Sequence, residues 1–189
     1  MIDSFIDDEV GIANGFLSAN LIERLRGNIY RLYANQSMVS AGIGNATIVV
    51  QDQLIRKDVI YWLDRSHNDD VENQFFKLMD CFVLHLNTTC FTGITSYEFH
   101  YALYEKGSFY KKHIDQFQQN GQRAFSMILY LNENWQENDG GELRIYHLDH
   151  RQNISPSGGK SVFFKSNELA HEVLLTHVPR MSITGWFKV

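Results

Sequence analysis

The chain has 189 residues, a formal net charge of −5, 44% hydrophobic residues and 13% aromatic residues. This composition fits one compact domain with a substantial core and leaves no room for a second domain. The negative charge and the absence of a sustained Lys/Arg run argue against a general nucleic-acid binder or membrane-surface binder. No stretch approaches the length of an apolar membrane span, and residues 1–9 lack a signal-peptide profile, so we expect a cytoplasmic protein.

Two helices are predicted in the first half of the chain. Ser18 is a suitable N-cap, and apolar residues at spacings of three and four follow it from Leu21 to Leu32. A second helix is expected to begin at Asp69, with Glu72 three residues later as in a capping box. Both helices carry an apolar stripe, which predicts that they cover a sheet.

The segment between these helices, residues 37–53, has a different pattern. It contains Ala-Gly-Ile-Gly-Asn-Ala and then a β-branched run, which predicts a flexible hairpin or finger. Loops of this kind often contact substrate.

From residue 95 onward the pattern changes to short β-type runs, with turn signals at residues 138–141 and 157–159. The predicted strands are residues 96–104, 108–114, 123–131, 142–146, 160–164, 170–175 and 180–188. This order, helices first and strands afterwards, predicts an α+β, mainly β fold: a double-stranded β-helix (jelly roll) with N-terminal helices packed on one face. Residues 1–94 would support a core formed by residues 95–189, within one structural domain.

One combination of residues points to a metal site. His113 and Asp115 are two apart, so in a strand both side chains would project from the same face. His171 follows 58 residues after His113 and would complete a set of two imidazoles and one carboxylate. This set, with its open positions, is the arrangement of non-haem Fe(II) oxygenases. Arg180, nine residues beyond His171, would hold a carboxylate acid nearby.

A second candidate pair has the same spacing. His147 and Asp149 are followed directly by His150, so the choice between the two pairs depends on context. The second set follows a predicted strand and leads into the polar segment 151–159, which ends in turn residues. That context predicts a solvated loop, so we prefer His113 and Asp115 and expect the second set at the surface.

Residues 104–115, Tyr-Glu-Lys-Gly-Ser-Phe-Tyr-Lys-Lys-His-Ile-Asp, have the pattern Tyr…Gly…Tyr-x-x-His-x-Asp. With a slightly shorter loop, this segment resembles the iron- and 2-oxoglutarate-dependent dioxygenases, and among them the prolyl-hydroxylase-domain enzymes best known for oxygen sensing. The resemblance extends over residues 95–189. The segments that follow in matching order are residues 123–132, Trp135, residues 140–145, residues 163–164, His171, Arg180 and residues 184–187. Upstream, residues 56–62 resemble the family's Arg-x-Asp-x-x-x-Trp segment, so the resemblance covers nearly the whole chain.

The resemblance implies roles for individual residues. It implies that Fe(II) is bound by His113, Asp115 and His171. It implies that the distal carboxylate of 2-oxoglutarate is bound by Arg180, Thr184 and Tyr130. The walls of the co-substrate pocket would be Tyr104, Ile128, Leu143 and Trp186, residue types that are otherwise ordinary core. The substrate side would include Arg123, Arg56 and Asp58. The last two would fix the finger, or would form an ordinary surface ion pair.

The implied activity is hydroxylation of a C–H bond with Fe(II), 2-oxoglutarate and O2, releasing succinate and CO2, with ascorbate as an accessory reductant. The resemblance favours a prolyl residue in a protein or peptide as substrate, with no nucleic-acid or membrane partner. Two alternatives stay open at this point. One is a hydroxylase of a free amino acid or small metabolite. The other is a non-oxygenase metal-binding module of the cupin type, which gives Arg180 no role.

Overall fold

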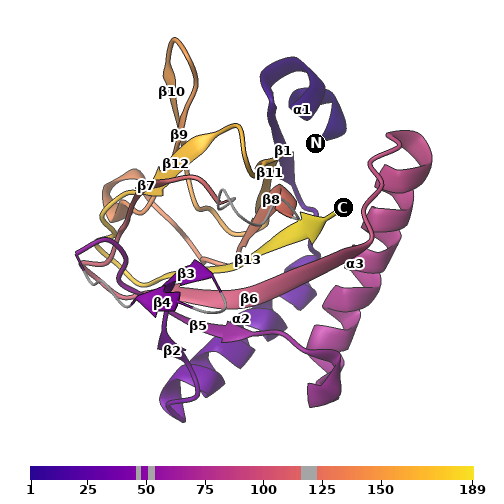
Figure 1. Ribbon diagram of the computed structural model, residues 1–189. Coiled ribbons are helices and arrows are strands. Elements are labelled where there is room, and N and C mark those ends of the chain that lie inside the picture. Colours follow the sequence, from indigo (N-terminus) through magenta and orange to yellow (C-terminus); the bar gives the residue numbers. More distant parts are fainter. Residues whose placement is uncertain (46–47, 51–53, 116–122) are drawn as a thin grey trace.

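The computed structural model describes residues 1–45, 48–50, 54–115 and 123–189. Two antiparallel sheets pack against each other, and helices cover the outer face of the larger one (Figure 1). The larger sheet has seven strands in the order β1-β11-β8-β13-β6-β5-β2, and the smaller has four in the order β10-β9-β12-β7. This arrangement confirms the predicted jelly roll with N-terminal helices on one face.

The strands of the larger sheet are β1 (Val10–Asn14), β11 (Lys160–Lys165), β8 (Arg123–Tyr130), β13 (Arg180–Lys188), β6 (Ser96–Tyr104), β5 (Asp58–Trp62) and β2 (Val39–Ser40). Those of the smaller sheet are β10 (Arg151–Ile154), β9 (Leu143–Tyr146), β12 (Ala170–Val173) and β7 (Tyr110–His113). A separate hairpin pairs β3 (Ile43–Asn45) with β4 (Ile48–Val50). The helices are α1 (Ile2–Asp8), α2 (Ala19–Ala34) and α3 (Asp70–Thr89), with 3-10 turns η1 (Arg65–His67) and η2 (Glu137–Asp139).

The two long helices begin where the sequence predicts. The Ser18 side chain accepts a hydrogen bond from the Leu21 amide at the start of α2, and Asp69 caps α3. The capping box is not formed as expected, because the Glu72 carboxylate pairs with His67 at 3.0 Å. Among the described residues, no helix combines the length and the apolarity that a membrane span requires.

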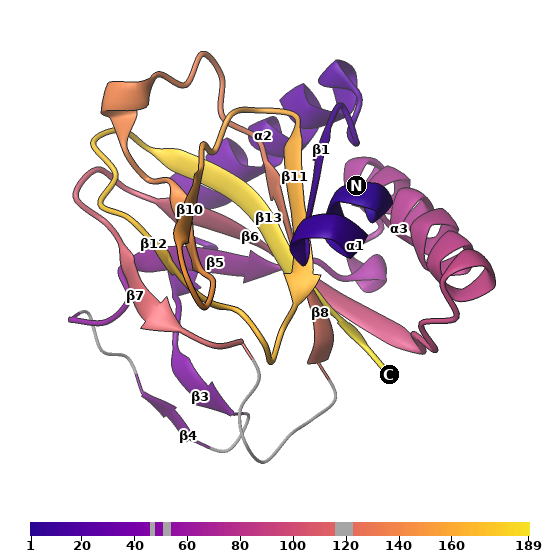
Figure 2. The ribbon, with the colours of Figure 1, turned by 90° about the horizontal axis from the view of Figure 1, so that it is seen from above.

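Helices α2 and α3 lie against the outer face of the larger sheet, on the side away from the four-stranded sheet (Figure 2). Successive strand residues point to opposite faces, so every second residue of β6, β8 and β13 reaches the helices. The main core joins these strands to the helices through Leu25, Ile29, Phe75, Met79, Phe99, Tyr101, Met127, Leu129, Ile183 and Phe187. Burying one such side chain stabilises the fold by about 1.5–3 kcal/mol.

The expected order of helices first and strands afterwards is wrong in detail. β1 pairs with β11 and β5 pairs with β6, so the first half of the chain supplies strands to the larger sheet. Both are short and lie outside the β-rich segment that begins at residue 95, so no run of predicted strands marks them. β1 also contains Gly11, where a Cβ atom would lie 2.8 Å from the Met1 carbonyl oxygen of α1's N-cap.

The finger predicted in residues 37–53 contains a hairpin. β3 and β4 pair antiparallel, with Ile43 opposite Val50. Residues 46–47 and 51–53 lie outside the described residues, and the flexibility of the finger stays a prediction.

Candidate active site

The inner face of the larger sheet carries a line of polar side chains. On β13, Arg180 and every second residue after it share the face that looks toward the smaller sheet. The register places Arg180 opposite Tyr104, and Thr184 between His100 and Ile128. Apolar clusters that include Val162 and Phe164 on one side, and Ile60 and Val173 on the other, enclose this line. We call this polar region between the two sheets the chamber.

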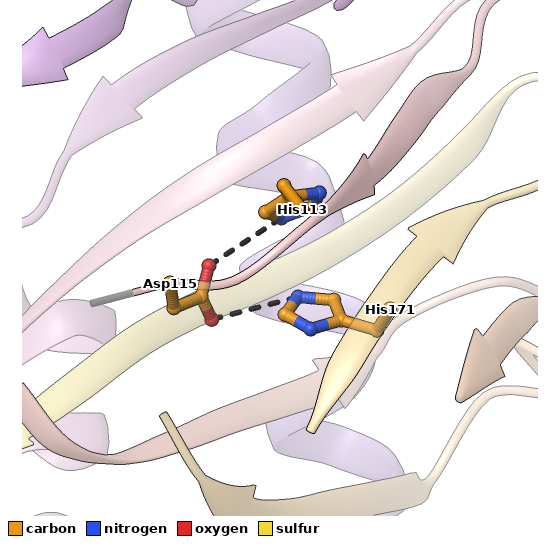
Figure 3. Close-up of side chains that lie close together, drawn as sticks. All are labelled: His113, Asp115 and His171. Atoms are coloured by element: carbon orange, nitrogen blue, oxygen red, sulfur yellow. Dashed lines mark ion pairs between the residues drawn. The ribbon is translucent and has the colours of Figure 1, made fainter. Parts of the chain in front are cut away.

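The predicted metal residues meet at this chamber (Figure 3). His113 ends β7 and lies directly opposite His171 of β12, while Asp115 follows β7 two residues later. The Nε2 atom of His113 is 3.4 Å from Asp115 Oδ1, and that of His171 is 3.6 Å from Asp115 Oδ2. One ligand atom from each residue lies within 4.8 Å of the others. Within the described ranges, this is the one group of three or more His, Cys, Asp or Glu residues so arranged.

Both imidazoles are oriented by backbone carbonyls. His113 Nδ1 lies 2.8 Å from the Lys111 carbonyl oxygen, and His171 Nδ1 lies 3.1 Å from that of Leu169. A carbonyl oxygen only accepts, so each Nδ1 donates, and each Nε2 faces Asp115 as the atom available to a metal. Second partners of this kind are the usual way in which proteins orient histidine ligands toward a metal.

The surroundings of Asp115 favour its ionised form. Burial opposes its ionisation, but His171, His113 and the Ser126 hydroxyl together hold its pKa well below the usual range. Ser126 donates to Asp115 Oδ2 at 2.7 Å and also bonds Ser166 at 2.8 Å. Burial lowers the pKa of His171 to about 4, although Asp115 acts in the opposite direction. A neutral imidazole beside a carboxylate is the form that binds metal.

The second His-x-Asp set lies elsewhere, as expected. His147, Asp149 and His150 connect β9 to β10, and the Asp149 and His150 side chains are 87% and 59% exposed. His150 Nδ1 pairs with Asp149 Oδ1 at 2.7 Å, and the two imidazole rings stack. The expected solvated loop is in part β10, which pairs with β9 to form a hairpin.

Arg180 is buried in the chamber with 2% exposure. Its Nε donates to the Gly141 carbonyl oxygen at 2.8 Å, and its guanidinium lies over the rings of Tyr104 and Tyr130 at 4.8 and 5.1 Å. No carboxylate of the described residues pairs with it, and the buried Tyr130 hydroxyl has no partner among them either. Leaving a cation unpaired in the interior is costly, so the chamber is suited to an anion.

The remaining pocket residues lie near this guanidinium. Thr184 is half-buried, with its hydroxyl 3.4 Å from that of Ser182, which Arg180 Nη1 approaches at 3.5 Å. Tyr104, Ile128 and Trp186 are buried on the inner face of the larger sheet. Leu143 is buried on β9 in the facing sheet.

The ion pair of Arg56 and Asp58 is not a surface pair. Two hydrogen bonds of 2.5 and 2.8 Å join them, with side chains 12% and 0% exposed, so that alternative is wrong. Burial opposes the charge on Arg56, but Asp58 holds its pKa above the usual value. The guanidinium also lies 4.6 Å over the Tyr110 ring, and Tyr110 stacks on His113. The pair thus ties the start of β5 to the strand that carries a metal ligand.

Arg123 lies at the other end of the inner face. Its guanidinium is 3.6 Å over the Trp186 ring and donates to Glu98, which also accepts from Lys188. About a quarter of the Arg123 side chain is exposed.

Sequence reasoning missed His100, Ser126 and Tyr110. The alternation that places Tyr104 on the inner face also places His100 there, four residues earlier on β6. Tyr110 is the second tyrosine of the Tyr…Gly…Tyr-x-x-His-x-Asp segment, but no role was assigned to it. Ser126 gave no comparable signal, because its importance depends on a contact across strands.

Comparison with known proteins agrees with this geometry. The model of the 2OG-Fe(II) oxygenase superfamily matches residues 99–188. A prolyl-4-hydroxylase from Pseudomonas putida is 34% identical, with a TM-score of 0.88 over 99% of this chain and 96% of that one. A Trichoplax adhaerens prolyl hydroxylase, solved with a hypoxia-inducible-factor peptide fragment, is 26% identical, with a TM-score of 0.81 over 99% and 86% of the two chains.

Among curated proteins, prolyl 3-hydroxylase OGFOD1 of Xenopus laevis is 33% identical over 34% of this chain. The match spans only 15% of that protein's length. The chain belongs to the 2OG-Fe(II) oxygenase superfamily and is similar to its prolyl hydroxylases. It is therefore an oxidoreductase that requires Fe(II), 2-oxoglutarate and O2, and its donor set and unpaired buried arginine fit these groups.

Proposed function

We propose that this enzyme hydroxylates a prolyl residue in a protein or peptide. The observation that carries the proposal is the joint placement of a His-Asp-His donor set and a buried arginine without an acidic partner in one chamber. A simple metal-binding module would explain the His-Asp-His donor set but would not explain the buried arginine.

In this proposal His113, Asp115 and His171 hold Fe(II) through Nε2, a carboxylate oxygen and Nε2. Arg180 binds the distal carboxylate of 2-oxoglutarate, with Thr184 and Tyr130 as hydroxyl donors. A guanidinium suits this task because its fork engages a carboxylate bidentately and stays charged at any working pH. Tyr104, Ile128, Leu143 and Trp186 exclude water around the co-substrate.

When bound, iron and 2-oxoglutarate supply the oxidation of a C–H bond by O2, with release of succinate and CO2. The chain's own residues fix the geometry. The Lys111 and Leu169 carbonyls hold the two imidazoles in one tautomer, and Ser126 fixes one carboxylate oxygen of Asp115. The surrounding aromatic and aliphatic side chains keep the site dry.

The choice of a prolyl substrate is supported by the similarity to prolyl hydroxylases from several organisms. We place the substrate at the end of the chamber that carries Arg123 and Trp186, near the segment with the β3–β4 hairpin. The Arg56–Asp58 pair would keep the base of that segment fixed. Ascorbate as reductant and a cytoplasmic location stay predictions.

The first test is anaerobic visible spectroscopy of the Fe(II)-loaded protein during titration with 2-oxoglutarate, because chelation produces a charge-transfer band. Wild type and His147→Ala should show the band, and His113→Ala should not. His147→Ala is the matched control, since it removes an imidazole with the same His-x-Asp spacing outside the chamber. A wild-type protein that binds iron but shows no band at any 2-oxoglutarate concentration would contradict the assignment of a 2-oxoglutarate site.

Substrate class is then tested by succinate release with proline-containing peptides, with the same peptides carrying alanine, and with free L-proline. Stimulation by the proline peptides alone supports the proposal. Stimulation by free proline or another amino acid would instead favour a small-molecule hydroxylase.

A further inference from the structure

The ring nitrogens of two side chains in the chamber have no hydrogen-bonding part in the roles above. His100 on β6 is 1% exposed and Trp186 on β13 is 6% exposed. Within the described part of the chain, neither ring nitrogen of His100 has a hydrogen-bond partner, and Trp186 Nε1 has none. Buried polar groups are nearly always bonded, so a pair of unbonded ones facing one chamber indicates a ligand.

The register places both groups toward the metal ligands. Trp186 lies opposite Ser126, whose hydroxyl bonds Asp115, and His100 lies opposite Thr184. The His100 and Trp186 rings stack with centroids 5.5 Å apart. Trp62 of β5 also contacts the His100 ring, with centroids 5.0 Å apart, and lies 6.3 Å from Trp186, so the three rings form one cluster. The pair is therefore held rigidly at this end of the chamber.

The far end of the chamber is marked by Ser182, which Arg180 Nη1 contacts at 3.5 Å. Ser182 and Trp186 are four residues apart, roughly 13 Å along an extended strand. This length is comparable with that of an extended five-carbon diacid that accepts a hydrogen bond at each end.

Electrostatics select the type of ligand. Burial, and then the nearby Arg56 and Arg123, lower the pKa of His100 to about 3, although Asp115 acts in the opposite direction. The imidazole is therefore neutral at working pH and has one N–H to donate. The Trp186 indole is a donor only. Two neutral donors close to arginine side chains favour an anionic oxygen over another donor.

2-Oxoglutarate has two carboxylates, and the proposed role of Arg180 accounts for one of them. We infer that His100, with Trp186 beside it, donates a hydrogen bond to the other carboxylate, the one next to the keto group. This inference rests on the proposed co-substrate pocket and extends it. His100 thereby becomes a positioning residue that fixes which end of the co-substrate faces the metal ligands.

The test uses two probes and four proteins. 4-Oxopentanoate keeps the keto group and the distal carboxylate of 2-oxoglutarate but has a methyl group in place of the other carboxylate. Fe(II)-loaded wild type, His100→Leu, His100→Met and His100→Gln are titrated anaerobically with 2-oxoglutarate, followed by the charge-transfer band. The affinity for 4-oxopentanoate is obtained by competition, and thermal unfolding shows which variants are folded.

We expect His100→Leu and His100→Met to bind 2-oxoglutarate on the order of tenfold to a hundredfold more weakly, as for a lost hydrogen bond to a charged group. Their affinity for 4-oxopentanoate should change much less, and His100→Gln should recover most of the lost affinity. Equal losses for both probes would mean that His100 only shapes the pocket, and unchanged 2-oxoglutarate affinity would overturn the inference.

Failure of the proposed pocket itself would look different. In that case wild type would not bind 2-oxoglutarate, or Arg180→Ala would bind both probes as wild type does. If the pocket stands but the His100 variants only raise the KM for a peptide, His100 contacts the substrate and the inference is wrong.

Discussion

The two faces of the seven-stranded sheet come from alternate residues of the same strands, yet most of the buried side-chain atoms without a hydrogen-bond partner in the described residues lie on one of them. On β13, Ile183 and Phe187 point outward into the helices, while Arg180 and Trp186 point into the chamber. Five buried side-chain atoms of the described residues have no hydrogen-bond partner. Four of them lie on the inner face, in His100, Tyr130 and Trp186.

The outer face therefore follows the ordinary rule of a packed core, and the inner face departs from it. Unsatisfied polar groups reduce stability unless a ligand completes them. Substitutions on the outer face should change the free energy of unfolding, and those on the inner face should change ligand binding. Stability and ligand binding thus depend on alternate residues of the same strands. Three predictions test this separation, and a fourth concerns a helix cap outside both faces.

The largest effect should come from Phe75 of α3, which is fully buried and packs edge-on against Phe99 at 5.1 Å. Phe75→Ala leaves a cavity and should lower the free energy of unfolding by about 3–5 kcal/mol. The folded protein should keep its 2-oxoglutarate affinity. Urea denaturation and the spectroscopic titration measure the two quantities. Leu84→Ala, on an exposed position of the same helix, is the control and should change neither.

Arg180→Ala should show the opposite pattern. The buried carboxylate of 2-oxoglutarate would lose its partner, which weakens binding by about 2–5 kcal/mol. The free energy of unfolding without ligand should fall little or even rise, because the substitution removes an unpaired buried cation. Arg144→Ala, which breaks the pair with Glu172 outside the chamber, is the control. Unchanged 2-oxoglutarate affinity in Arg180→Ala would mean that Arg180 does not bind the co-substrate.

These two faces also explain what the sequence could and could not predict. The apolar stripe of α3 and the alternation of β6 and β13 are local patterns, and all three elements form where they were expected. His113 and His171 were predicted as partners through spacing and family resemblance, and the structure pairs them directly. The strands β1 and β5 were missed because each has only five residues and both lie outside the β-rich segment that begins at residue 95.

The inner face was harder to predict than the outer one for a physical reason. A hydrogen bond such as that from Ser126 to Asp115 joins a strand to a loop and has no sequence period. The burial of Arg56 likewise depends on Tyr110, which meets it from another strand. Side chains that act across strands become visible only when the strands are paired.

Ser126→Ala tests the inner face without removing a metal ligand. Asp115 would lose the hydroxyl that orients Oδ2, and loss of such a supporting bond typically lowers metal affinity by about 10- to 100-fold. Stability should fall less than in Phe75→Ala, because only the hydrogen bonds to Asp115 and Ser166 are lost. Fe(II) affinity is measured by competition with a chelator. Ser161→Ala, a buried serine on the outer face, should leave the metal affinity unchanged, and an equal loss in both variants would contradict the separation of the faces.

The smallest effect is expected at Asp69, which belongs to neither face and caps α3. Its carboxylate accepts from the Val71 and Glu72 amides at 2.9 and 3.0 Å. Partial burial opposes ionisation, but these amides, Asn28 and Arg31 hold the pKa of Asp69 below its usual value. Asp69→Ala should lower the free energy of unfolding by about 1 kcal/mol at neutral pH and leave ligand binding unchanged.

A lowered pKa in the folded state means that the ionised Asp69 stabilises the fold above the unfolded-state pKa of about 3.9. That contribution is lost as the pH falls through the lower, folded-state pKa. The difference between wild type and Asp69→Ala should therefore shrink in urea denaturation below about pH 4. Asp70→Ala, an exposed neighbour, should show a smaller difference. A difference that stays constant into acid would mean that the cap acts through its neutral hydrogen bonds rather than through its charge.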